Sequence, residues 1–154
     1  MKRWEKEGVI EVDELDLPDE MQLKKGVAII ECVQEIPCNP CIDICPVQAI
    51  SMETVHALPK IDYQKCIGCG QCVEICPGLA IFLIKNKNSR AQVMLPYELL
   101  PLPDKGQTVT ALDREGKELC DAIVTNIKSN STTVITIELP KNHLMTVRNI
   151  RVVK

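Results

Sequence analysis

Eight of the nine cysteines in this chain of 154 residues lie in the short segment 32–76. Four of them follow the spacing C-x2-C-x2-C-x3-C-P, and they are Cys66, Cys69, Cys72 and Cys76. Three thiolates that are two residues apart can reach three corners of one iron–sulfur cubane, while a fourth, after a longer step, points elsewhere. The spacing therefore predicts an iron–sulfur site, because it arises by chance very rarely.

A related pattern precedes this motif by 31 residues and also ends in Cys-Pro. The equivalents of the last three cysteines are Cys38, Cys41 and Cys45. Such a similarity indicates an internal duplication. The equivalent of Cys66 is Glu35, which breaks the repeat, but Cys32 stands three residues before that glutamate. The first copy therefore has the spacing C-x5-C-x2-C-x3-C-P.

With these motifs, residues 27–84 resemble the two-cluster bacterial ferredoxin domain. In that family the fourth cysteine of each motif ligates the cluster of the other motif. The resemblance thus implies two [4Fe-4S] clusters. The ligands that it implies for one cluster are Cys45, Cys66, Cys69 and Cys72. Those that it implies for the other cluster are Cys38, Cys41, Cys76 and one further residue.

The fourth ligand of that second cluster is open at this point. We favour Cys32, because a thiolate is a softer ligand than a carboxylate and matches iron–sulfur iron better. The loop 33–37 would then bulge to bring the Cys32 thiolate in. Two alternatives are that Glu35 ligates through oxygen, or that the site holds a [3Fe-4S] cluster with one corner missing.

Other uses of clustered cysteines fit this sequence less well. Structural zinc sites prefer paired C-x2-C knuckles that are well separated along the chain. Disulfides are rare in reducing compartments, and the charged segment 1–7 shows no secretory signal. We therefore expect a cytoplasmic protein. The longest apolar run, 79–84, is far shorter than the roughly 20 residues that span a membrane.

The sequence divides into an N-terminal extension (1–26), a two-cluster ferredoxin domain (27–85) and a small all-β domain (86–154). In the first two parts we expect a strand at 9–12, a helix at 18–26, paired strands at 27–30 and 79–84, and a hairpin of 50–53 with 57–61. In the third part, apolar and polar residues alternate as in antiparallel strands at 107–112, 117–128, 132–139 and 144–153. The expected fold is α+β, with the ferredoxin-like domain followed by a small antiparallel β-barrel or sandwich.

Charge is distributed unevenly along the chain. Residues 1–85 contain 8 basic and 14 acidic residues, a net charge of −6, whereas residues 86–154 contain 10 and 7, a net charge of +3. There is no basic stripe with interleaved aromatic residues, which argues against binding of nucleic acid. Outside the cysteines no set of catalytic residues is apparent, so we do not expect the chain to be an enzyme by itself.

A cubane that is saturated by four thiolates leaves no iron open to a substrate, so its chemistry is one-electron transfer. Because the chain extends well beyond a ferredoxin-sized unit on both sides, we expect an electron-transfer subunit of a hetero-oligomeric oxidoreductase. Residues 31–46 also resemble the ferredoxin-like subunits of FAD-dependent amine or amino-acid dehydrogenases, which implies a flavoprotein dehydrogenase as partner. The alternatives are a freely diffusing ferredoxin with accessory domains and a redox-responsive regulator.

The two motifs also differ in what they offer to cluster sulfur. Gly68 and Gly70 permit positive φ angles, which can turn backbone N–H groups toward the sulfurs. In the first motif Pro40 has no N–H group to donate, and Asp43 adds negative charge. Because hydrogen bonds to sulfur favour the reduced cluster, we predict the higher potential for the cluster of the Cys66 loop.

Overall fold

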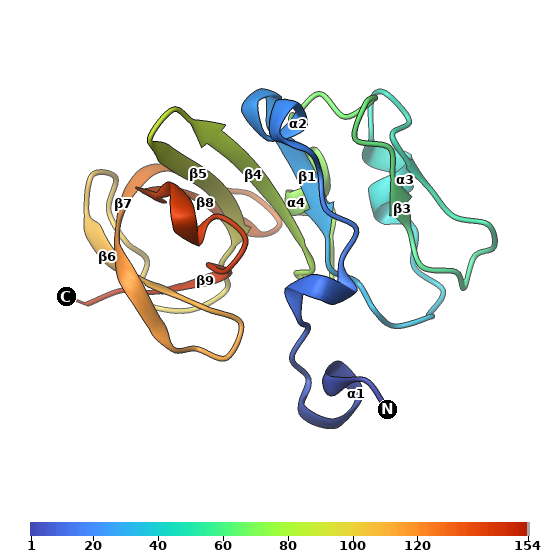
Figure 1. The fold of residues 1–154 in the computed structure, drawn as a ribbon, viewed down its shortest axis with the longest axis horizontal. Helices are drawn as coiled ribbons and strands as arrows, with labels where there is room; N and C mark the ends of the chain where they lie inside the picture. The colour runs from blue at the N-terminus through green and yellow to red at the C-terminus, as the bar shows by residue number, and fades with distance from the viewer. Residues whose placement is uncertain (154) are drawn as a thin grey trace.

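The computed structural model describes residues 1–153 and shows a mixed α and β fold built on a mostly antiparallel sheet (Figure 1). Seven strands form this sheet in the order β1-β4-β5-β8-β7-β6-β9, and all neighbours are antiparallel. The strands are β1 (Val27–Ile30), β4 (Ile81–Lys87), β5 (Arg90–Pro96), β8 (Thr133–Pro140), β7 (Glu118–Ser129), β6 (Thr108–Leu112) and β9 (Asn149–Arg151).

Of the two predicted architectures, barrel or sandwich, the barrel does not close among residues 1–153, since β1 and β9 are the two free edges of an open sheet. The C-terminal strands do not close on one another, because β5 pairs with β4 of the cysteine-rich half and leaves β9 as a free edge. Strand β4 leaves the cysteine-rich half, crosses the predicted boundary at residue 85 and pairs with β5 over Leu83–Lys87 and Arg90–Met94. The strands of both halves therefore share one hydrogen-bonded sheet.

The sequence did not predict β5, which follows a tight turn at Asn88 and Ser89. Asn88 has a positive φ of 54°, the backbone conformation that asparagine tolerates in hairpin turns. Ala91, Val93 and Leu95 alternate with polar or longer side chains and are fully buried. They pack with buried residues of β8 in the core of the sheet.

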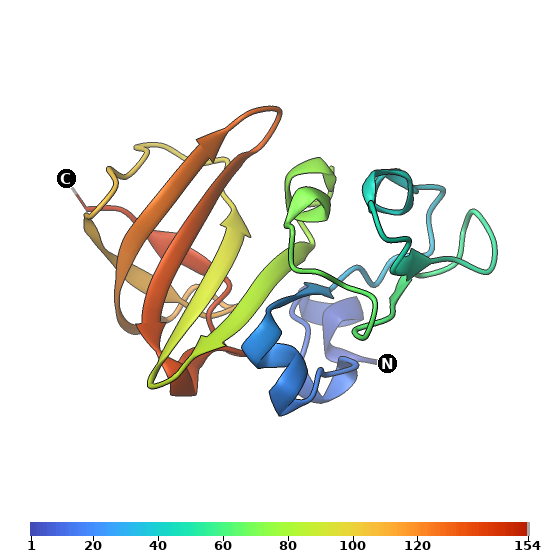
Figure 2. The ribbon, with the colours of Figure 1, turned by 90° about the horizontal axis from the view of Figure 1, so that it is seen from above.

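The cysteine-rich half consists of short elements beside β1. Two helices, α3 (Pro40–Ile44) and α4 (Gln71–Ile75), stand next to one another (Figure 2). Strands β2 (Ile50–Ser51) and β3 (Lys60–Ile61) form the predicted hairpin. The predicted pairing of the first and last strands of this half is also confirmed, with Val27 opposite Ile84 and Ile30 opposite Ile81.

The N-terminal extension contains three short helical segments, and the strand predicted at 9–12 is absent from it. These segments are α1 (Arg3–Glu7), the 3-10 turn η1 (Val12–Glu14) and α2 (Glu20–Lys25). Helix α2 matches the predicted helix and is capped by Asp19, whose carboxylate accepts the N–H of Gln22 at 2.8 Å. The extension lies against both halves, because Arg3 forms an ion pair with Glu115 and the Tyr63 hydroxyl donates to the Asp16 carbonyl at 2.5 Å.

The end of the chain also differs from expectation. In place of one long strand at 144–153, a 3-10 turn, η2 (Lys141–His143), leads through a loop to the short β9. Among residues 1–153, none of the helices combines the length and the apolar character that crossing a membrane would require.

Candidate iron–sulfur sites

The internal duplication is visible in the backbone. Helices α3 and α4 begin and end 31 residues apart, and each is followed by a turn whose last residue has a positive φ of 54°, Gln48 in the first copy and Leu79 in the second. A left-handed conformation costs a residue with a Cβ roughly 1–2 kcal/mol. Both copies accept this cost at the same place, so the turn serves a shared purpose.

That purpose is to direct a backbone N–H group at a thiol. The N–H of Ala49 donates to Cys45 Sγ at 3.3 Å, and the N–H of Ala80 donates to Cys76 Sγ at 3.5 Å. In both copies the cysteine is the residue that caps the helix. Each turn thus gives a cysteine sulfur a hydrogen-bond donor that would stabilise negative charge on it.

The cysteines do not group by copy. Cys45, from the end of α3, lines the same cavity as the first three cysteines of the second motif. We call this the regular cavity; its cysteines are Cys45, Cys66, Cys69 and Cys72. It comprises about 320 Å³ of space free of protein atoms, including the part that is open to solvent, and its remaining walls are mainly apolar side chains such as Val47 and Ile61.

Two glycines shape the loop around the regular cavity. Gly68 has φ +71° and Gly70 has φ +79°, as the sequence predicts. A Cβ on Gly68 would lie 2.8 Å from the carbonyl oxygen of Gly26, and one on Gly70 would lie 2.7 Å from Met94 Sδ. The loop therefore needs glycine both for its backbone angles and for its close approach to α2 and β5.

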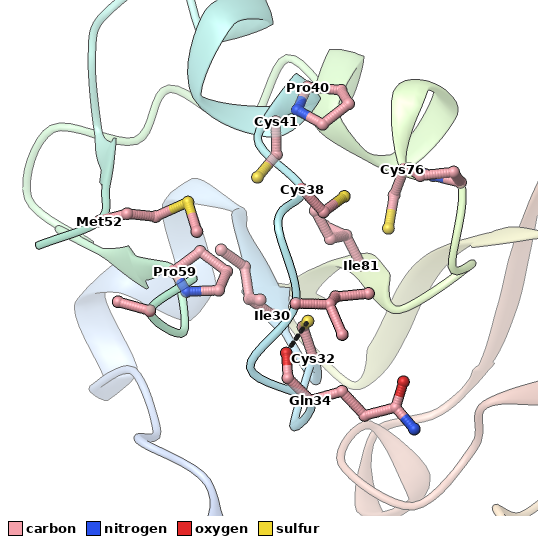
Figure 3. Close-up of a pocket in the computed structure, with 13 residues that line it drawn as sticks. Ile30, Cys32, Gln34, Cys38, Pro40, Cys41, Met52, Pro59, Cys76 and Ile81 are labelled. Atoms are coloured by element: carbon pink, nitrogen blue, oxygen red, sulfur yellow. Dashed lines mark hydrogen bonds between the residues drawn. The ribbon is translucent and has the colours of Figure 1, made fainter. Parts of the chain in front are cut away.

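The other four clustered cysteines line a second cavity (Figure 3), which comprises about 400 Å³ free of protein atoms, including the part that is open to solvent. We call it the irregular cavity; its cysteines are Cys32, Cys38, Cys41 and Cys76. Cys76 crosses over from the end of α4, Cys41 lies in α3 and Cys32 follows β1. Apolar side chains complete the wall, among them Ile30 and Ile81.

Cys32 and Glu35 occupy different environments. The Cys32 thiol lines the irregular cavity and donates a long hydrogen bond, 3.9 Å, to the Gln34 carbonyl. Glu35 is exposed and faces a separate depression that is also lined by Glu53 and His56. Of the two candidate ligands, only the thiol is at the wall that the other three cysteines share.

Burial raises the pKa of three of these thiols, Cys32, Cys41 and Cys72. It raises the pKa of Cys72 to about 12 and that of Cys41 to about 11, and neighbouring cysteines add to the effect. Such thiols hold their protons at neutral pH, whereas iron binds the thiolate. Iron binding must therefore displace protons from these residues.

The donor set and its spacing fit an iron–sulfur cluster. Four thiols around a cavity are the ligand set of a [4Fe-4S] cubane, and the N–H groups of Ala28, Ala49 and Ala80 donate to three of the sulfurs. Within residues 1–153 no three His, Cys, Asp or Glu side chains meet closely enough to hold a single metal ion. All nine cysteines are free thiols.

One family model matches part of the chain. Residues 59–82 match the 4Fe-4S binding domain. This segment runs from β3 through the loop of the regular cavity and α4 into β4, and it contains Cys66, Cys69, Cys72 and Cys76. The match indicates binding of a [4Fe-4S] cluster and a role in iron–sulfur electron transfer. No curated protein and no solved structure shows significant similarity to the chain.

Sequence reasoning did not find every residue that serves these cavities. The N–H donors to sulfur are those of three alanines, whereas we expected backbone N–H groups of the loop that contains Gly68 and Gly70. The pair Ala49 and Ala80 does repeat at the 31-residue interval, and this regularity was the available signal. Ala28 had no such signal, because its contact with Cys66 joins residues 38 positions apart.

Proposed function

We propose that the chain binds two [4Fe-4S] clusters, one in each cavity, and serves as the iron–sulfur subunit of an oxidoreductase. The observation that carries this proposal is the division of eight cysteines into two cavities of four. The cysteine that caps each helix lines the cavity of the other motif, as in two-cluster ferredoxins. When bound, each cluster supplies one-electron oxidation and reduction.

In this proposal the eight cysteines hold iron as thiolates, and Cys32 is the eighth ligand. The apolar walls of both cavities keep water from the clusters, which lowers the local dielectric constant and tunes the potential. The N–H groups of Ala28 and Ala49 stabilise negative charge in the regular cavity, and that of Ala80 does so in the irregular cavity. The residues other than the cysteines position the clusters and tune their potentials, so we do not propose that the chain is an enzyme by itself.

Exposed apolar residues beside the regular cavity support electron exchange with a protein partner. Cys69 is exposed, the neighbouring Ile67 has 56% of its surface accessible, and Ile75 on α4 has 37% accessible. This side of the molecule belongs to the acidic half of the sequence. A partner with a complementary positive surface would be steered to it.

We propose a flavoprotein dehydrogenase as that partner. A flavin takes two electrons from a substrate and can release them singly to an iron–sulfur protein. Native size-exclusion chromatography of the protein from its source is the test, and we expect co-elution with a flavin-containing chain. Elution as a lone chain would favour a free ferredoxin. A cluster-dependent rearrangement of residues 90–154 without a partner would favour a redox-responsive regulator.

The cluster content is tested by iron and acid-labile sulfide analysis of protein that is prepared without air. We expect about eight irons per chain. Cys32→Ser should reduce this to about seven and produce an EPR signal in the oxidised protein, because a three-iron cluster is then paramagnetic. Unchanged iron content and an unchanged spectrum in Cys32→Ser would remove Cys32 from the ligands.

The exchange of ligands between the motifs has its own test. Cys45→Ser should perturb the EPR signal of the same cluster as Cys72→Ser, although Cys45 is closer in sequence to Cys41. Cys76→Ser should instead perturb the same signal as Cys41→Ser. If each variant altered the cluster of its own motif, the two-cluster arrangement proposed here would be incorrect.

A further inference from the structure

A buried ion cluster joins the cysteine-rich half to the C-terminal strands. Glu31 accepts hydrogen bonds from Arg114, from Nε at 2.8 Å and from Nη2 at 3.1 Å, and from Arg148 Nε at 2.5 Å. Only 5% of the Glu31 side chain is accessible, against 11% for Arg114 and 4% for Arg148. These partners lie 83 and 117 positions away in the sequence.

Glu31 occupies a position that determines where Cys32 points. It directly follows β1, and its N–H donates to the Ala80 carbonyl at 2.8 Å, which extends the pairing with the segment before β4. Successive side chains of an extended segment point to opposite sides. Ile30 and Cys32 line the irregular cavity, and Glu31 faces a different pocket that Arg114 and Arg148 also line.

The two arginines are themselves held firmly. Arg114, in the turn between β6 and β7, also donates to the Met145 carbonyl at 2.8 Å. Arg148 donates to the Leu144 carbonyl at 2.9 Å, and its guanidinium lies 5.2 Å from the centre of the Phe82 ring. Glu31 is therefore bound to a fixed part of the C-terminal half rather than to mobile surface side chains.

Cys32 differs from the other seven clustered cysteines in what surrounds it. Those seven belong to the repeated motif: six lie in α3 or α4 or within two residues of them, and Cys66 lies in the loop that leads into α4. Residues 31–36 belong to no helix or strand, so the segment that carries Cys32 has no local element to orient it. The anchored Glu31 is its immediate neighbour.

We propose that Glu31, Arg114 and Arg148 form a positioning clamp that holds the Cys32 thiol at the irregular cavity. The inference builds on the proposed function, in which Cys32 is a ligand. The C-terminal strands then take part in assembling the irregular cluster, because they supply both arginines. The regular cluster does not depend on the clamp.

The test compares Glu31→Gln with the wild-type chain. Glutamine keeps the size of the side chain but removes the charge that pairs with two arginines. We expect the iron content to fall from about eight to about seven per chain, with the same EPR signal in the oxidised protein as in Cys32→Ser. The EPR signal of the regular cluster should be unchanged and also reports that the chain is folded.

A second variant and a control keep the test decisive. Arg114→Lys keeps a positive charge but cannot form the two-point contact with Glu31, so we expect a partial loss of the same iron. Glu138→Gln removes an ion pair with Lys87 on the same sheet, 3.2 Å apart, and should retain all of the iron. This control distinguishes the loss of the clamp from the general effect of replacing a carboxylate on the sheet.

Each outcome bears on one proposal. If Cys32→Ser loses iron while both Glu31→Gln and Arg114→Lys keep wild-type iron and spectra, the clamp is refuted and the ligand assignment stands. If Cys32→Ser changes nothing, the ligand assignment fails first. If Glu31→Gln does not fold, Arg114→Lys decides: selective loss of the irregular signal supports the clamp, and loss of both signals or of neither refutes it.

Discussion

The regular and the irregular cavity descend from two copies of one repeat but are completed in different ways. In the regular cavity, Cys66 and Cys69 come from one short loop whose glycines have positive φ angles, and Cys72 comes from the helix α4 that follows it directly. In the irregular cavity, Cys32 comes from a segment without regular structure that follows β1. One cavity is thus specified mainly by local sequence and the other mainly by packing.

The two cavities also differ in the number of backbone hydrogen bonds that their cysteine sulfurs accept. Two thiols of the regular cavity accept backbone N–H groups, Cys66 from Ala28 at 3.4 Å and Cys45 from Ala49 at 3.3 Å. In the irregular cavity, Cys76 accepts one from Ala80 at 3.5 Å. Pro40, which begins α3, has no N–H to offer where the second copy has Gln71. The two copies of the repeat thus share a backbone conformation but differ in the N–H groups that they offer to sulfur.

The largest expected effect is that of removing the clusters altogether. Small cysteine-rich units gain much of their folding free energy from metal–thiolate bonds. Anaerobic removal of iron with a chelator should therefore abolish hydrogen-exchange protection in residues 31–80, whereas β5, β7 and β8 should keep theirs. Loss of protection throughout the sheet would show that both halves unfold as one unit. The distinction between a locally specified cavity and one specified by packing would then not hold.

A smaller effect should follow Gly68→Ala, with Gly106→Ala as its matched control. Both glycines have positive φ, +71° and +88°, so either change costs about 1–2 kcal/mol in backbone strain. Only at Gly68 would the new Cβ also meet a backbone carbonyl, 2.8 Å away. We expect Gly68→Ala to lose the EPR signal of the regular cluster, and Gly106→Ala to keep both clusters with a midpoint of unfolding about 2–8 °C lower.

Equal cluster content in the two glycine variants would contradict this account. The approach of the loop to Gly26 would then be adjustable, and the regular cavity would depend less on its local backbone than we infer. The unfolding midpoint of the Gly106→Ala variant, measured without air by circular dichroism, sets the scale for strain alone.

The most subtle effect concerns the two reduction potentials. Additional N–H donors to sulfur stabilise the reduced, more negative cluster, so the regular cluster should be reduced first. A potentiometric titration followed by EPR measures the order, and the Cys32→Ser variant assigns the signals. The opposite order would mean that the charge of the nearby Arg114 and Arg148 outweighs the hydrogen bonds at sulfur.

Much of the cysteine-rich half could be predicted because its signals are local. The 31-residue repeat, the strand at 27–30 and the hairpin of β2 with β3 all follow from spacing and short apolar runs. Strand β5 was not predicted, since the segment 85–90 before it has no apolar residue and Pro96 interrupts the sequence at its end. The alternation of Ala91, Val93 and Leu95 after an Asn-Ser turn was a usable hairpin signal.

The barrel, one of the two architectures predicted for the C-terminal part, does not close for a related reason. Alternating patterns identify strands but not their partners, and the edge offered by β4 lies outside the segment that seemed to form a separate domain. The length of β9 was overestimated because residues 144–148 form a turn and loop before the strand, and their buried apolar side chains, Leu144 and Val147, pack there as well as they would in a strand. The burial of apolar residues does not by itself distinguish a strand from a turn or loop.

The spacing of the cysteines alone indicates sulfur ligands for a cubane, in two copies at a fixed interval. This could be predicted because ligand spacing is a property of residues that lie close together in the chain. Only the tertiary structure decided which cysteines share a cavity, that Cys32 rather than Glu35 reaches the irregular one, and that Glu31 is buried against Arg114 and Arg148. The first two outcomes bring together cysteines of both motifs and of the segment after β1. The third joins Glu31 to arginines that lie 83 and 117 positions away. Their contact is set by the pairing of β4 with β5, which brings the two halves into one sheet.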